Sequence, residues 1–303
     1  MEILVTGGAG FIGSHTADFL VARGHHVTVL DNLCNGSRDQ VPPGADFLQL
    51  DLGDPTLPGH LARLRPEAVL HFAAQIDVRT SCSAPVFDAQ QNILGTLALI
   101  EAGLANGLQH FIFASSGGAI YGEAHGPQDE GHPEQPINPY GVAKLSVDKY
   151  LHAYTVQRGL RTCSLRLANA YGPRQGAVGE AGVVAMFCRR LARGQAPRIH
   201  GDGLQTRDFV YVGDLAEGFG AALEQRAAGV INLATGRETS ILELARGLCL
   251  QAGLDPAGIE HGPGIAGEQR RSVLDPAKAR AELGWSARTP VAQGLAATWN
   301  GFR

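Results

Sequence analysis

A glycine-rich turn between a short strand and a helix lies at the start of the chain. The apolar run at 3–6 is followed directly by Gly7, Gly10 and Gly13, and residues 14–22 read as a helix. Glycines at this spacing let the backbone turn tightly, approach a pyrophosphate and pack the helix on the strand. The helix N-terminus then offers its N–H groups to the phosphates. The pattern predicts a β-α unit that binds a dinucleotide.

An acidic residue follows at the distance that such a unit requires. A second apolar strand at 27–30 ends in Asp31, about 20 residues after the glycines. A carboxylate at this place binds ribose hydroxyls and repels a 2′-phosphate. The sequence therefore favours NAD over NADP.

Further along the chain, short apolar runs alternate with helix-length segments. Runs such as 68–72 are apolar throughout, which is typical of a parallel sheet that is covered on both faces. The fold class expected is α/β, a doubly wound parallel (Rossmann) sheet with a smaller C-terminal substrate-binding lobe. We expect the cofactor domain at 1–169, with a return of the chain near 205–235, and mainly the substrate lobe at 170–303. The strands expected are 3–6, 26–31, 46–50, 68–72, 109–115 and 161–168. The helices expected are 12–23, 56–64, 84–105, 138–158, 180–193, 214–225, 240–252, 276–283 and 291–300.

The composition of the chain argues against nucleic acid, membranes and metal ions as partners. A net charge of -4 gives no basic surface for nucleic acid or membranes, and no apolar stretch approaches the ~18 residues of a membrane span. The five cysteines are scattered, which indicates reduced thiols and a cytoplasmic protein. The histidines show no metal-ligand spacing, so no metal is expected.

Proton-transfer chemistry is suggested by three side chains. Ser116 ends an apolar run, and Tyr140 and Lys144 follow in the pattern Tyr-x-x-x-Lys. On a helix, the tyrosine and the lysine lie one turn apart on the same face. The ammonium then favours the phenolate form, so that Tyr140 can act as a base towards an alcohol.

Together these motifs resemble the extended short-chain dehydrogenase/reductase family. Within it, the chain is similar to the NAD-dependent sugar-nucleotide epimerase/dehydratase branch, and there to the UDP-glucose 4-epimerases. The resemblance covers nearly the whole chain. It is carried by Gly7–Gly13, 31–35, 51–52, 71–74, Asn92, 140–144, 166–174, 207–212 and 275–285.

The resemblance implies 4-epimerisation of a UDP-sugar through a 4-keto intermediate, with NAD regenerated in each cycle. UDP-glucose/UDP-galactose and also UDP-N-acetylglucosamine/UDP-N-acetylgalactosamine are the expected substrates. Tyr140 is the expected base, Lys144 holds the nicotinamide ribose, and Ser116 binds the 4-oxygen. A homodimer is expected. The alternatives are a UDP-glucuronate 4-epimerase, a nucleotide-sugar dehydratase or reductase, and a non-catalytic NAD sensor.

Two glycines after Ser116 affect both the residue assignment and the reaction. Counting from Phe113 places the catalytic hydroxyl on Ser116, whereas counting back from Tyr121 would place Gly117 there. We adopt the first count, with Ser115 in reserve. Dehydratases of this branch carry an acidic residue just after the hydroxyl, and here Gly117-Gly118 stand instead. The next carboxylates are Glu123 and Asp129, so epimerisation is favoured.

The resemblance also implies the remaining contacts. Those to the cofactor are Gly7, Gly10, Phe11, Ile12, Gly13, Asp31, Asn32, Asn35, Gly36, Asp51, Leu52, Phe72, Ala73, Ala74, Asn92, Tyr140 and Lys144. Those to the substrate are Ser116, Asn169, Val183, Arg207, Arg271 and Ser272.

The substrate contacts include one departure from the family pattern. Arg207 matches a phosphate-binding arginine, but the second such arginine, expected two positions before Gly267-Glu268, is replaced by Ile265. In the family that the chain resembles, a residue shortly after this Gly-Glu pair lies beside the C2 substituent of the sugar, and a small side chain there admits N-acetylated sugars. Counting on from Gly267-Glu268, this position is Ser272. Asp208 is expected to have a structural hydrogen-bonding role.

Overall fold

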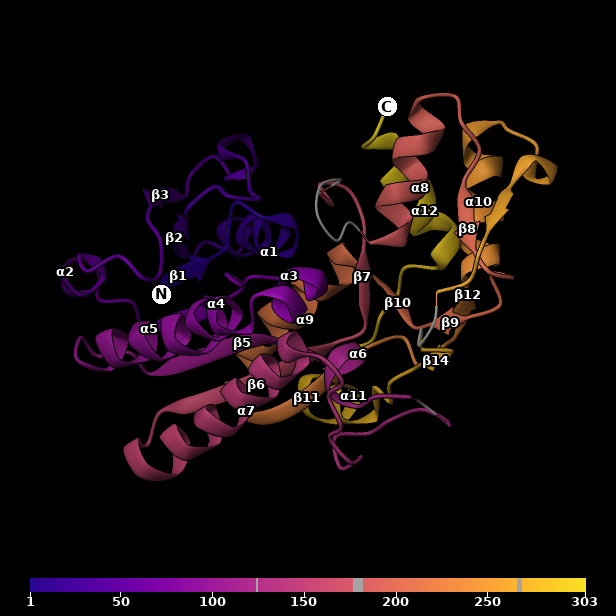
Figure 1. Cartoon of the computed structure of the whole chain (residues 1–303). Coiled ribbons are helices and arrows are strands. Elements are labelled where there is room, and N and C mark those ends of the chain that lie inside the picture. Colours follow the sequence, from indigo (N-terminus) through magenta and orange to yellow (C-terminus); the bar gives the residue numbers. More distant parts are fainter. Residues whose placement is uncertain (124, 177–181, 266–268) are drawn as a thin grey trace.

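The computed structural model describes residues 1–123, 125–176, 182–265 and 269–303. Its centre is a parallel sheet of seven strands in the order β11-β6-β5-β4-β1-β2-β3 (Figure 1). The bounds are β1 Glu2–Thr6, β2 His26–Asp31, β3 Asp46–Gln49, β4 Ala68–His71, β5 His110–Ser116, β6 Arg161–Leu167 and β11 Gly229–Leu233. The expected doubly wound fold is confirmed.

Helices cover both faces of the sheet, and the alternation of side chains along the strands builds two cores. On one face, Ile3 and Val5 pack with α1 (Phe11–Ala22), α9 (Val212–Glu224) and α11 (Ala277–Leu283). On the other, Leu4 packs with α2 (Leu57–Leu64), α5 (Gly95–Leu104) and α7 (Pro139–Arg158). Burial on both faces explains why these strands read as continuous apolar runs.

The helix expected at 84–105 consists of three consecutive pieces. They are α4 (Pro85–Ala89), a π-helical turn at Gln90–Leu94 and α5. The π-helical turn contains Asn92, one of the expected cofactor contacts. The short helices α3 (Val78–Ser83) and α6 (Gly117–Ile120) were not predicted, because each spans fewer residues than a periodic pattern needs.

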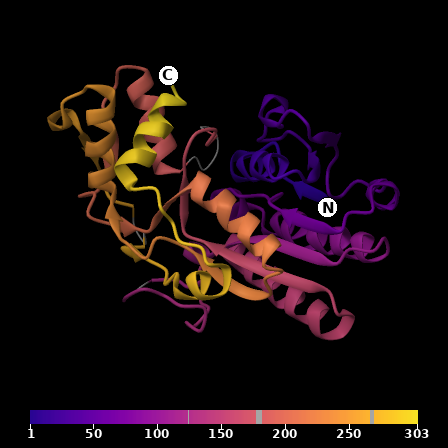
Figure 2. The same cartoon turned by 180° about the vertical axis from the view of Figure 1, so that it is seen from behind.

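A second lobe lies beyond the carboxyl ends of the strands (Figures 1 and 2). Its core joins α8 (Val183–Ala192), α10 (Ile241–Ala252) and α12 (Val291–Asn300) through residues such as Phe187, Leu244 and Trp299. Residues 180–181 of the helix expected at 180–193 lie outside the described residues. The short strands are β7 Asn169–Tyr171, β8 Arg198–His200, β9 Thr206–Arg207, β10 Phe209–Tyr211, β12 Thr239–Ser240, β13 Glu260–Gly262 and β14 Arg271–Ser272, with 3-10 turns at Arg38–Gln40 and Pro256–Gly258.

The chain returns to the sheet after entering this lobe. Strand β11 pairs with β6 as the edge strand, and α9 packs against α1. A return near 205–235 was expected, but β11 was absent from the predicted strands because its run is short and interrupted by Asn232. A further return at Ala279–Trp285 was not foreseen, and Leu283 and Trp285 belong to the first core.

Candidate active site

The glycine-rich turn is tightly packed between β1 and α1. Gly7 has a φ of 66°, and a Cβ there would lie 2.6 Å from the amide nitrogen of Ala73. A Cβ on Gly13 would lie 2.2 Å from the carbonyl oxygen of Gly7. Helix α1 begins after Gly10 with neither a side-chain cap nor an acidic residue in its first turn. Its N-terminal amides therefore suit an anionic group from outside the chain, as the pyrophosphate of a dinucleotide provides.

Asp31, at the end of β2, is nearly buried beside this turn. Its Oδ2 accepts a hydrogen bond from the amide of Ala9 at 3.0 Å, and its Oδ1 accepts one from the amide of Leu33 at 2.8 Å. The carboxylate thus joins the glycine turn to the loop after β2. Each oxygen has a second lone pair with which it can accept a ribose hydroxyl.

Neighbouring residues of the expected cofactor set support this arrangement. Asn32 Nδ2 donates to Asp51 Oδ2 at 2.7 Å, and a Cβ on Gly36 would lie 2.7 Å from the carbonyl oxygen of Ala9. The loop after β2 therefore lies directly on the glycine turn. Phe11 and Ile12 are half-buried, Asn35 is exposed, and Leu52 is buried.

The end of β4 forms the next wall, and a buried histidine supports it. His71 forms hydrogen bonds with Thr6 Oγ1 at 2.6 Å and with Thr96 Oγ1 at 2.9 Å. Burial lowers the pKa of His71 to about 3, so the ring is neutral at physiological pH. The sequence motif at 71–74 was noted, but this role of His71 was not predicted, because its partners lie on two distant segments.

Asn92 forms hydrogen bonds that hold the segment after β4. Its Oδ1 accepts from the amide of Gln75 at 2.8 Å, and its Nδ2 donates to the carbonyl of Gln75 at 2.9 Å and to Asp88 Oδ1 at 3.0 Å. Asn92 thereby fixes the segment that follows Phe72, Ala73 and Ala74, which are all half-buried.

Of the three expected catalytic side chains, Ser116 ends β5, whereas Tyr140 and Lys144 lie on α7, which packs against β5. Helix α7 begins at Pro139, and Asn138 caps it by accepting from the amide of Gly141 at 2.8 Å. Tyr140 therefore lies in the first turn, and Lys144 follows one turn later. The ammonium nitrogen of Lys144 lies 5.7 Å from the centre of the Tyr140 ring and donates to the carbonyl of Ala114 at 2.8 Å.

Burial brings the pKa of Lys144 closer to physiological pH. The side chain is buried, and burial lowers its pKa to about 8, while Asp148 and Asp88 act in the opposite direction. This ammonium lies near the half-buried phenol of Tyr140.

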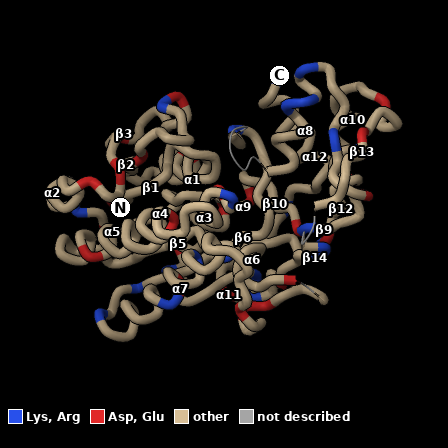
Figure 3. The backbone as a smooth tube through the Cα atoms, viewed as in Figure 1, with Lys and Arg blue, Asp and Glu red and all other residues tan. Residues whose placement is uncertain are grey.

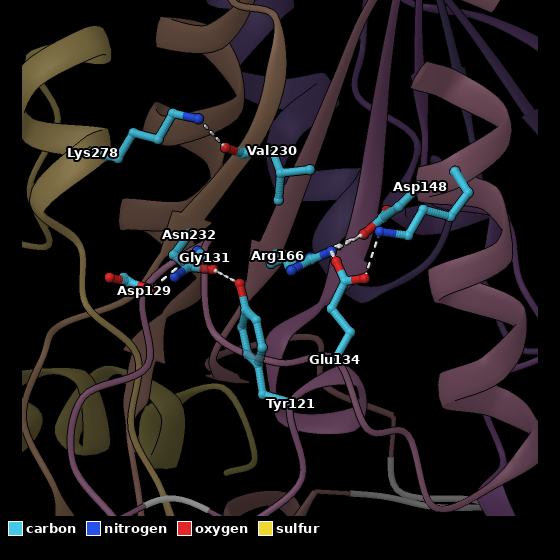
Figure 4. Close-up of polar contacts among 10 residues, drawn as sticks. Tyr121, Asp129, Gly131, Glu134, Asp148, Arg166, Val230, Asn232 and Lys278 are labelled. Carbon is cyan, nitrogen blue, oxygen red and sulfur yellow. Dashed lines mark hydrogen bonds and ion pairs between the residues drawn. The ribbon is translucent and has the colours of Figure 1, made fainter. Parts of the chain in front are cut away.

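A buried ion-pair cluster lies between α7 and β6 (Figure 4). Arg166 Nε donates to Asp148 Oδ2 at 2.9 Å, and Arg166 Nη2 contacts Glu134 Oε1 at 2.5 Å. Its guanidinium lies 4.9 Å from the centre of the Tyr121 ring, whose hydroxyl donates to Asn232 Oδ1 at 3.0 Å. The cluster ties the loop between α6 and α7 to β6 and β11. Arg166 lies in one of the motifs that carry the family resemblance, but the sequence alone assigns it no role.

Two of the expected sugar-binding residues lie close to the glycines that follow Ser116. A Cβ on Gly118 would lie 3.7 Å from Asn169 Oδ1 and 3.8 Å from Ser272 Oγ, so these two side chains face the same glycine. A Cβ on Gly117 would lie 2.4 Å from Leu274, which explains why no side chain fits there. The structure therefore brings Asn169 and Ser272 together beside Gly118, two residues after Ser116. Gly267-Glu268, from which Ser272 is counted, lies outside the described residues.

The remaining candidates differ in their surroundings. Arg207 lies on β9 directly opposite Ser272 on β14, and it donates to the carbonyls of Thr206 at 2.8 Å and Gln269 at 2.7 Å. Arg271 instead forms an ion pair with Glu238, where charges of both signs lie side by side around β9, β12 and β14 (Figure 3). Val183 is the half-buried first residue of α8.

Asp208 has the structural role expected of it. Its carboxylate accepts from the amides of Thr235 and Gly236, while its backbone bonds to Asn169 and Ser272.

The comparisons with known proteins agree with this geometry. Residues 3–234 match the model of the NAD dependent epimerase/dehydratase family. The chain belongs to that family. The matched range includes the glycine turn, Asp31 and the Tyr140–Lys144 pair.

Three family members show how far the likeness extends. The chain is 40% identical to UDP-glucose 4-epimerase of Mycolicibacterium smegmatis, over 100% of this chain and 99% of the relative. The crystal structure of UDP-glucose 4-epimerase with UDP-glucose from Thermotoga maritima has 42% identity and a TM-score of 0.96, covering 100% of this chain and 99% of that one. The Thermus thermophilus enzyme in complex with NAD has 41% identity and a TM-score of 0.94, with coverage of 100% and 99%.

The described residues also bear on the expectations about membranes, metals and cysteines. No described helix is long and apolar enough to cross a membrane. Among the described residues, no cluster of three or more His, Cys, Asp or Glu is arranged to hold a metal ion. All five cysteines are free, and Cys34 and Cys82 are exposed whereas Cys163, Cys188 and Cys249 are buried.

Proposed function

We propose that this family member is an NAD-dependent 4-epimerase of UDP-sugars, acting on UDP-glucose and UDP-galactose. The observation that carries the proposal is the placement of Ser116 at the carboxyl end of β5 and of the Tyr140–Lys144 pair on the adjoining α7. Asn169 and Ser272 lie beside Gly118, two residues after Ser116. The likeness over the full chain to the UDP-glucose 4-epimerases of Mycolicibacterium smegmatis and Thermotoga maritima supports the choice of substrate.

The cofactor's place follows from the residues that fit it. The α1 amides would hold the pyrophosphate, Asp31 the adenosine ribose, and Lys144 the nicotinamide ribose. When bound, NAD supplies the oxidising and reducing capacity at the sugar's C4. The chain's own task is then to move one proton and to orient the sugar.

Proton transfer is assigned to the phenol and the serine. Tyr140 removes the proton of the 4-hydroxyl when the alcohol becomes a ketone, and returns it when the ketone is reduced on its other face. Ser116 donates a hydrogen bond to the 4-oxygen and relays the proton to or from Tyr140. The Lys144 charge favours the phenolate that this step needs.

Elimination of water is disfavoured at this site. Gly117 and Gly118 provide no acid after Ser116, and the next carboxylate, Glu123, accepts hydrogen bonds from the amides of Arg270 and Arg271. A 4,6-dehydratase therefore lacks its proton-transfer group here, and epimerisation remains.

N-acetylated sugars are also proposed as substrates. Ser272 is small, and its side chain and that of Asn169 both face Gly118, a residue without a side chain. An N-acetyl group on C2 therefore meets little steric obstruction there.

A homodimer is proposed from exposed apolar side chains on adjacent helices. Those on α4, the π-helical turn and α7 are Val86, Phe87, Leu94, Val142, Tyr150 and Val156. These helices pack beside one another, so a second copy could cover the patch. Light scattering after gel filtration would give the mass of a dimer.

The location and the domain division also remain proposals. A cytoplasmic location is supported by five free cysteines, two of which are exposed. A cofactor domain at 1–169 and a substrate lobe mainly at 170–303 are supported by the separate core of α8, α10 and α12.

The decisive experiment is to incubate the purified protein with individual UDP-sugars without added NAD. Formation of the C4 epimer is expected. A 4-keto-6-deoxy product would select the dehydratase instead, and no reaction with any UDP-sugar would overturn the proposal.

A further inference from the structure

Glu123 connects the loop after α6 to the strand that carries Ser272. Its Oε2 accepts a hydrogen bond from the amide of Arg270 at 2.9 Å, and its Oε1 accepts one from the amide of Arg271 at 2.8 Å. The partners are 147 and 148 residues apart in the chain. Two amides bound by one carboxylate fix both the position and the direction of the backbone that carries them.

Adjacent contacts extend this connection along the same two segments. The carbonyl of Gly122 accepts from the side-chain amide of Gln269. Further on, the amide of Gln128 donates to the carbonyl of Val273 at 3.0 Å, and the amide of Asp275 donates to the carbonyl of Gln128 at 2.9 Å. Residues 122–123 and Gln128 therefore lie beside residues 269–275, and Glu123 is the charged side chain among these contacts.

The segment fixed in this way positions two expected substrate contacts. The Arg207 guanidinium donates to the carbonyl of Gln269 at 2.7 Å, and Ser272 pairs with Arg207 in the β9–β14 register. The side chains of Arg270 and Arg271 bond instead to Asp202 and Glu238, which belong to the substrate lobe. Of the contacts that these two arginines make, those to the loop after α6 come from their backbone amides.

We propose that Glu123 is a positioning residue for the substrate site. It holds residues 269–272 near the carboxyl end of β5. It thereby fixes the positions of the Arg207 guanidinium and the Ser272 side chain. The inference rests on the proposed function and adds to it a residue that touches neither substrate nor cofactor.

The test is the variant Glu123→Gln. Glutamine retains one acceptor oxygen but turns an NH₂ group towards a backbone N–H, so one bond is lost and the other loses its charge. We expect the KM for UDP-glucose and the dissociation constant of UDP, measured by calorimetry, to rise about tenfold, while kcat and bound NAD stay at the wild-type level. A merely structural role would not separate KM from kcat.

Glu130→Gln provides the matched control. Glu130 lies in the same loop and also accepts from a backbone amide, that of Asn232 at 2.7 Å, but this amide belongs to β11. The control should keep wild-type KM and UDP affinity. Unchanged UDP affinity in Glu123→Gln, an equal change in both variants, or loss of NAD from Glu123→Gln would overturn the inference. UDP binding needs no turnover, so this result stands apart from a failure of wild type to convert UDP-sugars.

Discussion

Ser115 and Ser116 are consecutive residues at the end of β5, yet they lie in different environments. Ser115 is buried beside the carboxyl group of Asp148 on α7, whereas Ser116 is half-buried and precedes α6. Neighbouring side chains on a strand face opposite sides of the sheet. The arrangement favours Ser116, and not Ser115, as the hydroxyl that reaches the sugar.

Replacing these two serines separately tests that assignment. Ser116→Ala is expected to lower kcat by about 10²–10⁴-fold, the range typical of one lost proton-transfer partner. Ser115→Ala should retain most of the activity, since its hydroxyl faces the core. The measurement is the initial rate of UDP-galactose formation. An inactive Ser115→Ala protein together with an active Ser116→Ala protein would reverse the assignment.

Tyr140→Phe is expected to abolish measurable turnover. The change removes a single hydroxyl from the first turn of α7, so the helix cap at Asn138 and the cofactor site should persist. Circular dichroism and the amount of bound NAD should match the wild type. Retention of substantial activity would show that another group removes the proton.

Asp31→Ala is expected to weaken NAD binding roughly 10- to 100-fold, because a charged acceptor for ribose hydroxyls is lost. Bound NAD is quantified after the purified protein is denatured. Asp31→Asn is the matched control for charge: it should bind NADP better than wild type, because the repulsion of the 2′-phosphate is removed. Equal binding of NAD and NADP by the wild type would contradict the role of Asp31.

Ser272→Tyr is expected to separate two substrates. A phenol at this place fills the space beside Asn169 and Gly118, so conversion of UDP-N-acetylglucosamine should be suppressed while that of UDP-glucose continues. Rates for both sugars are compared with those of Ser272→Ala, which should convert both. The pocket assignment would be wrong if the tyrosine variant lost both activities equally.

Acid is expected to destabilise the protein through His71. Its pKa in the folded state is about 3 because the ring is buried, whereas in the unfolded chain it is near 6.5. Between these values the unfolded chain binds a proton that the folded one does not, so this contribution to stability falls as pH drops below about 6.5. The slope is about 1.4 kcal/mol per pH unit. His71→Gln should show a shallower decline in urea unfolding between pH 6.5 and 4, and an unchanged slope would exclude this origin.

The parts of the site that the sequence could predict are local. Gly7 and Asp31 lie within a single β-α-β unit, and Tyr140 and Lys144 within one helical turn, so spacing alone places them. Glu123 and Arg166 could not be assigned in this way. Their partners, Arg271 for Glu123 and Glu134 for Arg166, approach only after distant segments pack together, and no periodicity in the sequence records that approach.

The edge position of β11 has a consequence for folding during synthesis. Strand β6 lacks one neighbour until residue 233 has left the ribosome, because β11 is the strand that pairs with it. A nascent chain that ends near residue 169 therefore exposes the backbone N–H and C=O groups of β6, which is a hazard for aggregation. Completion of the sheet should coincide with synthesis of β11, well after the cofactor-binding residues have been translated.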